Sequence, residues 1–286
     1  MRLGYNTNGL AHHDAERGLS MLADIGYESV ALTLDHGLLN PWADDFKSQV
    51  RRMRGMLAEL HLRSVVETGA RFLLDPRRKH QPTLLSPDAM DRALRIGFLK
   101  QAIDVASRLG SDCVSLWSGV LDEAIPDEQA FDRLTAGLRE TLAFAAERNV
   151  VLGFEPEPGM FIDTMERFAQ LHQRLDDPLF RLTLDVGHLH CQGELPLADY
   201  IRRFAPQIVN VHLEDMRRGV HEHLMFGEGE IDFPPVIAAL AEAGYDGPLH
   251  VELSRHSHMA PIAAQRSFDF LSPLVRAAEG KTEERN

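Results

Sequence analysis

Residues 150–159 of the chain read VVLGFEPEPG, an apolar run that ends in two glutamates, each followed by a proline. Consecutive apolar residues are typical of a parallel strand that helices cover on both faces. The run therefore predicts a buried parallel strand. Pro156 has no N–H group and ends the strand's hydrogen bonding, so Glu155 stands at the carboxyl end of the strand.

Seven further apolar runs of this kind alternate with segments of helical periodicity, such as 131–148 and 236–243. The eight predicted strands are 3–7, 29–34, 64–68, 113–117, 150–155, 181–186, 208–213 and 249–253. This alternation predicts an α/β fold, a single-domain (β/α)8 TIM barrel over residues 1–278, followed by a charged, flexible tail at 279–286. A doubly wound sheet is less well supported, because the first strand lies in MRLGYNTNG and no GxGxxG follows it.

Composition narrows the class of protein. The formal net charge of −13 argues against binding to nucleic acid, which requires a basic surface. Cys113 and Cys191 have no CxxC spacing, the first residues lack the apolar core of a signal peptide, and no apolar run spans a membrane. We therefore expect a cytoplasmic protein with no membrane partner; a homodimer or homotetramer is only the general prior for such barrels.

Four residues of metal-binding type lie at the ends of four successive predicted strands, namely Glu155, Asp185, His212 and Glu252. Their separations of 30, 27 and 40 residues are each about one strand–helix unit, so we expect the side chains to converge at the carboxyl ends of the strands. An oxygen-rich set with one imidazole suits Mn²⁺, Mg²⁺, Co²⁺ or Zn²⁺. One acid at a strand end is often a helix cap, but four such residues predict a site for one divalent metal.

Five stretches, GFEPEPG, LTLDVGHLH, NVHLED, FGEGEIDF and GYDGPLHVEL, together resemble the xylose-isomerase-like TIM-barrel superfamily. That superfamily contains sugar (phosphate) isomerases and epimerases, ketose 3-epimerases, inosose dehydratases and metal-dependent apurinic endonucleases. The resemblance implies the same four metal ligands, with Glu155 and Glu252 as the acid/base pair. It also implies that His188 contacts the substrate and that Arg217 is the nearest match to a substrate-binding arginine.

The chemistry of such a site is coherent. Proton removal beside a carbonyl gives an enediolate, which a divalent metal stabilises, and two carboxylates on opposite sides of the substrate return the proton. We predict a metal-dependent isomerase or epimerase of a sugar, a sugar phosphate or a related small polyhydroxy carbonyl compound. The alternatives are a multinuclear phosphodiesterase similar to the apurinic endonucleases and a non-catalytic sugar-binding barrel.

Two histidines after the seventh predicted strand depart from the epimerase pattern. His221 and His223 face the same way if their segment is extended. In the endonucleases, an Asp-x-His at the matching place holds an additional metal together with the histidine that matches His188. The three histidines therefore have two interpretations, a second metal site or contacts to substrate hydroxyls.

Further residues are candidates for substrate contact: Asn6, Glu67, Trp117 and Glu157. Asn6 is equally typical of a turn, Trp117 of a core and Glu157 of a loop. Glu67 and Trp117 stand near positions where the endonucleases need histidines, which argues against that activity. The long segment 69–87 is expected to cover the active site, and Gly227 with Gly229 gives a weak indication of phosphate binding.

Overall fold

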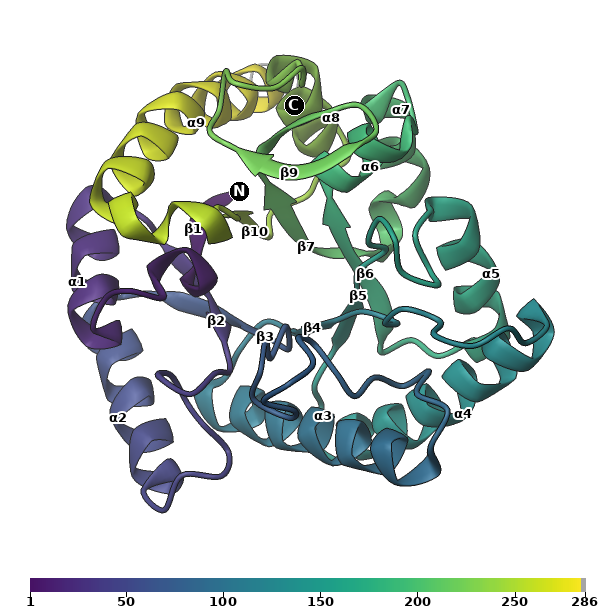
Figure 1. The fold of residues 1–286 in the computed structure, drawn as a ribbon. Helices are drawn as coiled ribbons and strands as arrows, with labels where there is room; N and C mark the ends of the chain where they lie inside the picture. Colours follow the sequence, from purple (N-terminus) through teal and green to yellow (C-terminus); the bar gives the residue numbers. More distant parts are fainter. Residues whose placement is uncertain (284–286) are drawn as a thin grey trace. The chain divides into compact units, whose positions relative to one another are not determined.

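Eight parallel strands form one closed sheet in the computed structural model, which describes residues 1–283 (Figure 1). The strand order is β1-β10-β7-β6-β5-β4-β3-β2. The strands are β1 (Arg2–Asn6), β2 (Ser29–Thr33), β3 (Arg63–Glu67), β4 (Val114–Leu116), β5 (Leu152–Phe154), β6 (Phe180–Asp185), β7 (Ile208–Leu213) and β10 (Pro248–Val251). Each overlaps one predicted strand, so the predicted α/β barrel is confirmed.

Helices alternate with these strands, as predicted (Figure 1). They are α1 (Ala15–Ile25), α2 (Phe46–Glu59), α3 (Ala89–Leu109), α4 (Asp127–Ala146), α5 (Met165–Leu175), α6 (Val186–Gln192), α7 (Leu197–Phe204), α8 (Phe233–Glu242) and α9 (Ala260–Glu283). Local sequence explains several of the helix ends. The side chains of Asp14, Asp88 and Thr164 cap helix N-termini, and Gly26 and Gly110 end helices in the left-handed conformation.

By its internal packing the chain divides into two compact units, which are described separately. The first contains residues 1–31, 58–63 and those from 183 onward. In it β1 pairs with β2 and β10, and β10 pairs with β7. The helix α8 packs against both α7 and α9. The carboxyl ends of β6, β7 and β10 therefore belong to one unit.

The second unit contains residues 32–57 and 64–182. In it β3, β4 and β5 form a parallel ladder that continues into β6, where Phe154 pairs with Leu182. The helices α3 and α4 pack against each other. Phe154, Phe168 and Phe180 form an aromatic cluster with ring centroids 5.4–6.4 Å apart, which packs α5 onto the sheet.

A hairpin after β7 was not predicted. The strands β8 (Asp215–Arg217) and β9 (Val220–Leu224) pair in antiparallel fashion, and β9 lies beside α6 (Figure 1). The buried carboxylate of Asp215 holds the hairpin in place. It accepts hydrogen bonds of 2.9–3.1 Å from the N–H groups of Met216, Gly227, Gly229 and Ile231. The N–H groups of Gly227 and Gly229 therefore bind Asp215, so the structure gives no support to the phosphate interpretation of these glycines.

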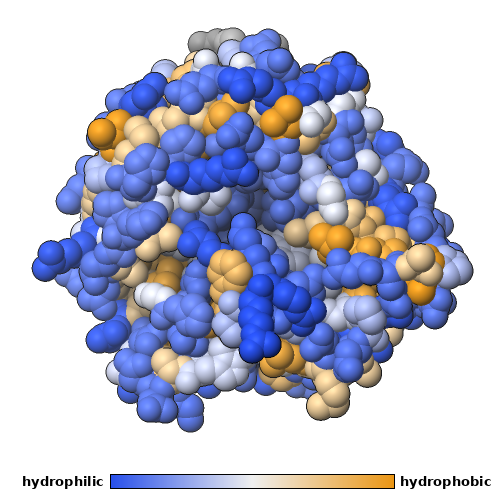
Figure 2. All heavy atoms as spheres, viewed as in Figure 1, coloured by the Kyte–Doolittle hydropathy of each residue, from blue (hydrophilic) through white to orange (hydrophobic). Residues whose placement is uncertain are grey.

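The face drawn in Figure 2 is mostly hydrophilic, with small hydrophobic areas. Within residues 1–283, no helix combines the length and the apolar character needed to cross a membrane. The C-terminal helix α9 continues through residues 279–283 of the predicted tail, and residues 284–286 lie outside the described part of the chain. The domain boundary at 278 stays a prediction.

Candidate metal centre

Three of the four predicted ligands lie together in the first unit. Asp185 ends β6, His212 lies in β7, and Glu252 directly follows β10. The Nδ1 atom of His212 is 2.8 Å from Oε2 of Glu252 and 3.8 Å from Oδ2 of Asp185. One ligand atom from each residue lies within 4.8 Å of the others, so this group could hold a metal ion.

The two carboxylate oxygens of Asp185 have different roles. Its Oδ1 accepts the N–H of His188 at 2.7 Å and caps α6, as the ordinary interpretation of an acid at a strand end requires. Its Oδ2 is buried and accepts no N–H group of residues 1–283. Such an oxygen is costly to bury unless a proton on a neighbouring acid or a cation compensates it, and this atom fits a metal ligand.

Glu252 is oriented by a hydrogen bond from the turn that follows β1. Asn8, in the 3₁₀ turn η1 (Thr7–Leu10), donates a 2.7 Å hydrogen bond from Nδ2 to Oε1 of Glu252. Burial raises the pKa of Glu252, but its electrostatic interaction and hydrogen bond with His212 outweigh burial and lower the pKa. Glu252 is therefore ionised at neutral pH.

Glu155 belongs to the second unit. It directly follows β5 and is buried, and its N–H donates to the carbonyl of Leu116 at 2.8 Å. Because Phe154 pairs with Leu182, Glu155 leaves its strand beside the segment of β6 that continues to Asp185. Its role as a fourth ligand stays a prediction, which this register supports.

Glu214 is a buried acid that the sequence prediction missed. Its carboxyl oxygens accept no N–H or O–H group from the described residues, but the carboxyl group can hydrogen-bond to Asp185. Burial, followed by the charges of Asp185 and Glu252 and then by this hydrogen bond, raises its pKa well above the ordinary value and favours the protonated form. A Cβ at Gly187 would lie 1.9 Å from its Oε1, so only glycine leaves room for the carboxyl group there.

A signal for Glu214 was present in the sequence. Asn210 and His212 lie in β7 and Glu214 directly follows it, each two residues apart, and side chains at that spacing point to the same face of a strand. The polar alternation inside an otherwise apolar strand could therefore have indicated that three polar groups share one face.

The three histidines also come together. His221 and His223 lie on β9, half-buried, and His188 is buried in α6. The Nε2 atoms of His188 and His221 are 3.1 Å apart, and the ring centroids of His223 lie 5.9 Å and 5.4 Å from those of His188 and His221. One nitrogen from each ring lies within 4.8 Å of the others. The Nδ1 atom of His223 is 3.0 Å from the carbonyl of Glu252, to which it donates its proton.

His188 predicts how stability depends on pH in the metal-free protein. Burial lowers its pKa to about 4, while the unfolded chain binds a proton near pH 6.5. Between these pH values the unfolded state therefore binds more protons than the folded state. As the pH falls from about 6.5 to about 4, His188 lowers the free energy of unfolding by about 3 kcal/mol. We expect urea unfolding in a chelator to show this loss. His188→Gln should flatten the curve over that range, and an unchanged slope would contradict the assignment.

Two other predicted contacts of the first unit have structural roles. The side chain of Asn6 accepts the N–H of Asn8 at 3.0 Å and caps η1, the turn role that the sequence left open. Arg217 is exposed on β8 and donates to the carbonyl of Glu228 at 3.1 Å. Their predicted contacts with substrate stay predictions.

Three residues that were predicted to contact the substrate lie in the second unit. Glu67 ends β3 and is buried, and Glu157 donates its N–H to the carbonyl of Ile162 at 3.1 Å within a turn. Trp117 follows β4, is buried, and has the guanidinium of Arg95 4.4 Å from its ring centroid. Burial lowers the pKa of Arg95 to about 9, and its NH2 group donates to the carbonyl of Thr68 at 3.0 Å.

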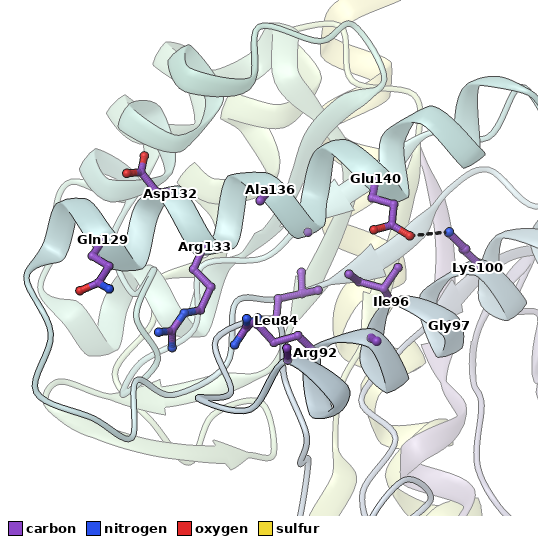
Figure 3. Close-up of a pocket in the computed structure, with 13 residues that line it drawn as sticks. Leu84, Arg92, Ile96, Gly97, Lys100, Gln129, Asp132, Arg133, Ala136 and Glu140 are labelled. Atoms are coloured by element: carbon purple, nitrogen blue, oxygen red, sulfur yellow. Dashed lines mark hydrogen bonds and ion pairs between the residues drawn. The ribbon is translucent and has the colours of Figure 1, made fainter.

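A groove of 710 Å³ in the second unit lies between α3 and α4 (Figure 3). Small residues (Ala89, Ala93, Gly97, Ala136 and Gly137) and charged residues such as Arg92, Asp132 and Arg133 line it. An ion pair of 2.7 Å between Lys100 and Glu140 lies at one end. None of the sequence-predicted site residues lines this groove, so it plays no part in the proposed chemistry.

Comparison with known proteins gives a family and a fold. The family model described as xylose isomerase-like TIM barrel matches residues 19–274. L-ribulose-5-phosphate 3-epimerase UlaE of Escherichia coli (strain K12) is 25% identical over 248 residues, which cover 86% of this chain and 84% of the relative.

Two solved structures share the fold at lower identity. The structure of L-ribulose 3-epimerase has a TM-score of 0.78 at 20% identity and covers 100% of this chain and 98% of its own. The IOLI protein with a bound zinc atom has a TM-score of 0.78 at 17% identity, covering 97% and 99%. At these identities the two structures support the fold alone.

Proposed function

The chain belongs to the xylose isomerase-like TIM barrel family, and from this we propose that it is a divalent-metal-dependent epimerase or isomerase of a small ketose or ketose phosphate. The observation that carries the proposal is the group Asp185, His212 and Glu252, in which a buried carboxylate oxygen that accepts no N–H group lies close to an imidazole and an ionised glutamate. The similarity to L-ribulose-5-phosphate 3-epimerase UlaE supports a sugar as the substrate class.

We assign four metal ligands, Glu155, Asp185, His212 and Glu252. Glu155 directly follows β5, which pairs in parallel with β6, the strand that ends in Asp185. This pairing supports Glu155 as a ligand. A set of three carboxylates and one imidazole suits Mn²⁺, Mg²⁺, Co²⁺ or Zn²⁺. When bound, the ion would stabilise the negative charge that develops on the two oxygens of an enediolate.

The two glutamates have the chemical properties of a proton-transfer pair. Glu252 is ionised, held by Asn8 and His212, and able to accept a proton from the carbon beside a carbonyl. Glu155 would return a proton from the other face of the substrate, which gives epimerisation at that carbon. If one glutamate instead moved the proton from one carbon to the neighbouring carbon, the result would be isomerisation.

The proposal is tested by solvent deuterium exchange. The purified chain, loaded with Mn²⁺, Co²⁺ or Zn²⁺, is incubated in D₂O with D-allulose, L-ribulose and L-ribulose 5-phosphate, and NMR follows the proton beside the carbonyl. We expect metal-dependent exchange of that proton and appearance of the epimer. Binding of a sugar without exchange would support the sugar-binding alternative, and cleavage of DNA at an abasic site would support the phosphodiesterase alternative.

We further propose that His188, His221 and His223 bind a second cation rather than substrate hydroxyls. Tetrahedral Zn²⁺ with Zn–N bonds of about 2.0–2.1 Å separates two ligand nitrogens by roughly 3.3 Å, close to the 3.1 Å between His188 and His221. Because Nδ1 of His223 donates to a carbonyl, its Nε2 carries the free lone pair that a metal needs.

Metal counting separates the two roles of the histidines. We expect two Zn²⁺ ions per chain by mass spectrometry of the dialysed protein, and one ion in the His221→Ala, His223→Ala variant. His256→Ala, which removes an imidazole outside both groups, is the matched control and should retain two. One ion in the wild-type protein would support substrate contact by these histidines.

A further inference from the structure

A row of four residues crosses the sheet of the first unit behind the metal centre. Ser29 of β2 pairs with Gly4 of β1, Gly4 pairs with His250 of β10, and His250 pairs with His212 of β7. The absence of a side chain at Gly4 makes room for the imidazole of His250, since a Cβ there would lie 2.2 Å from its Cδ2. The ring of His250 therefore fills the space between Ser29 and β7.

Hydrogen bonds connect this row to the ligand His212. The Nε2 atom of His212 lies 3.1 Å from Nδ2 of Asn210, and Oδ1 of Asn210 lies 2.8 Å from Nδ1 of His250. The Nε2 atom of His250 lies 2.9 Å from Oγ of Ser29, which is 3.4 Å from the carbonyl of Arg63. Asn210, His212, His250 and Ser29 are each at most 1% exposed, so water does not satisfy these groups.

The direction of these bonds determines where His212 carries its proton. An amide N–H₂ group only donates, so Nε2 of His212 accepts and its single proton lies on Nδ1, 2.8 Å from Oε2 of Glu252. In this tautomer Nδ1 has no lone pair for a cation. The metal-free site is thus stabilised by a hydrogen bond between two of its own ligands.

Turning the amide of Asn210 by half a rotation reverses the direction of the bonds that join His212, Asn210, His250 and Ser29. His212 then donates from Nε2 to Oδ1 of Asn210, and Nδ2 of Asn210 donates to Nδ1 of His250. His250 donates from Nε2 to Ser29, and the hydroxyl of Ser29 donates to the carbonyl of Arg63. Every donor keeps an acceptor, both imidazoles stay neutral, and Nδ1 of His212 becomes free to bind a metal.

We propose that Asn210, His250 and Ser29 form a reversible positioning chain that switches His212 from its metal-free tautomer to its metal-binding tautomer. This inference rests on the proposed metal site, to which it adds three residues that do not touch the ion. Partners of this kind behind a ligating histidine typically contribute 10–100-fold to metal affinity.

The decisive comparison is between two substitutions of Asn210. Asn210→Leu has nearly the same shape but no polar atoms, and we expect its Zn²⁺ affinity, measured by competition with a chromophoric chelator, to fall about 10–100-fold. Asn210→Asp offers only acceptors, which fixes the proton of His212 on Nε2, so its affinity should equal or exceed that of the wild type. A purely structural role predicts that the buried aspartate weakens binding more than leucine does, and this outcome would overturn the proposal.

A second measurement does not depend on variants at Asn210. Nitrogen-15 NMR of the histidine side chains should show His212 protonated at Nδ1 in chelator and at Nε2 after addition of Zn²⁺. Ser29→Ala should weaken binding by less than Asn210→Leu, while the buried Ser267→Ala in α9 should leave it unchanged. If His212 keeps one tautomer throughout, the chain does not reverse. If instead Asp185→Asn still binds two Zn²⁺ ions per chain, the proposed metal site itself is wrong.

Discussion

Replacing Glu252 by glutamine is expected to lower epimerase turnover by about 10²- to 10⁴-fold, the usual contribution of a general acid or base. The amide cannot accept the proton beside the carbonyl, yet it keeps the shape of the side chain and an oxygen for His212. Deuterium incorporation from D₂O into the ketose, followed by NMR, measures the effect directly. Glu155→Gln should produce a loss of the same order, because the opposite face of the substrate then lacks its acid.

Glu222→Gln is the matched control for both substitutions. Glu222 lies on β9 between two histidines, and its carboxylate pairs with Arg255 at 3.1 Å on the surface. We expect this variant to retain wild-type turnover. Exchange that persists in both Glu155→Gln and Glu252→Gln, with metal bound, would show that neither glutamate transfers the proton.

Replacing Asp215 by alanine is expected to destabilise the protein by about 3–5 kcal/mol, because four N–H groups lose their acceptor in a buried position. The loss should be concentrated in the β8–β9 hairpin and the turn that contains Gly227 and Gly229. Urea unfolding gives the total, and hydrogen exchange of these amides gives its location.

Asp246→Ala removes an exposed aspartate from the same unit and serves as the control. Its stability should lie within about 0.5 kcal/mol of the wild type, as is usual for surface positions. If Asp215→Ala unfolds at the same urea concentration as the wild type, the carboxylate does not hold the hairpin. Protection of the Gly227 and Gly229 amides should then also be unchanged.

The barrel was predictable because its strands are buried on both faces and are therefore apolar residue by residue. Val150 to Phe154 shows this pattern, and the structure places β5 within it. The hairpin β8–β9 was not predictable in this way, because its strands are short and polar. A side chain, Asp215, fixes it rather than an apolar face.

The grouping of the proposed metal ligands was predictable for a related reason. Parallel strands in a barrel bring their carboxyl ends to one edge, so Asp185, His212 and Glu252 could be associated by spacing alone, and the structure brings these three together. Asn6 shows the limit of such reasoning. A polar residue at a strand end can equally cap the next turn, and only the fold decides which bond it makes.

The sequence by itself determined the α/β barrel and the chemical type of the metal site, because both depend on the order and spacing of residues along single strands. Only the tertiary structure decided the surroundings of that site. Burial and two neighbouring acids raise the pKa of Glu214, and Ser29, Asn210 and His250 meet across strands that are distant in sequence. Such contacts depend on strand register, which local sequence does not encode.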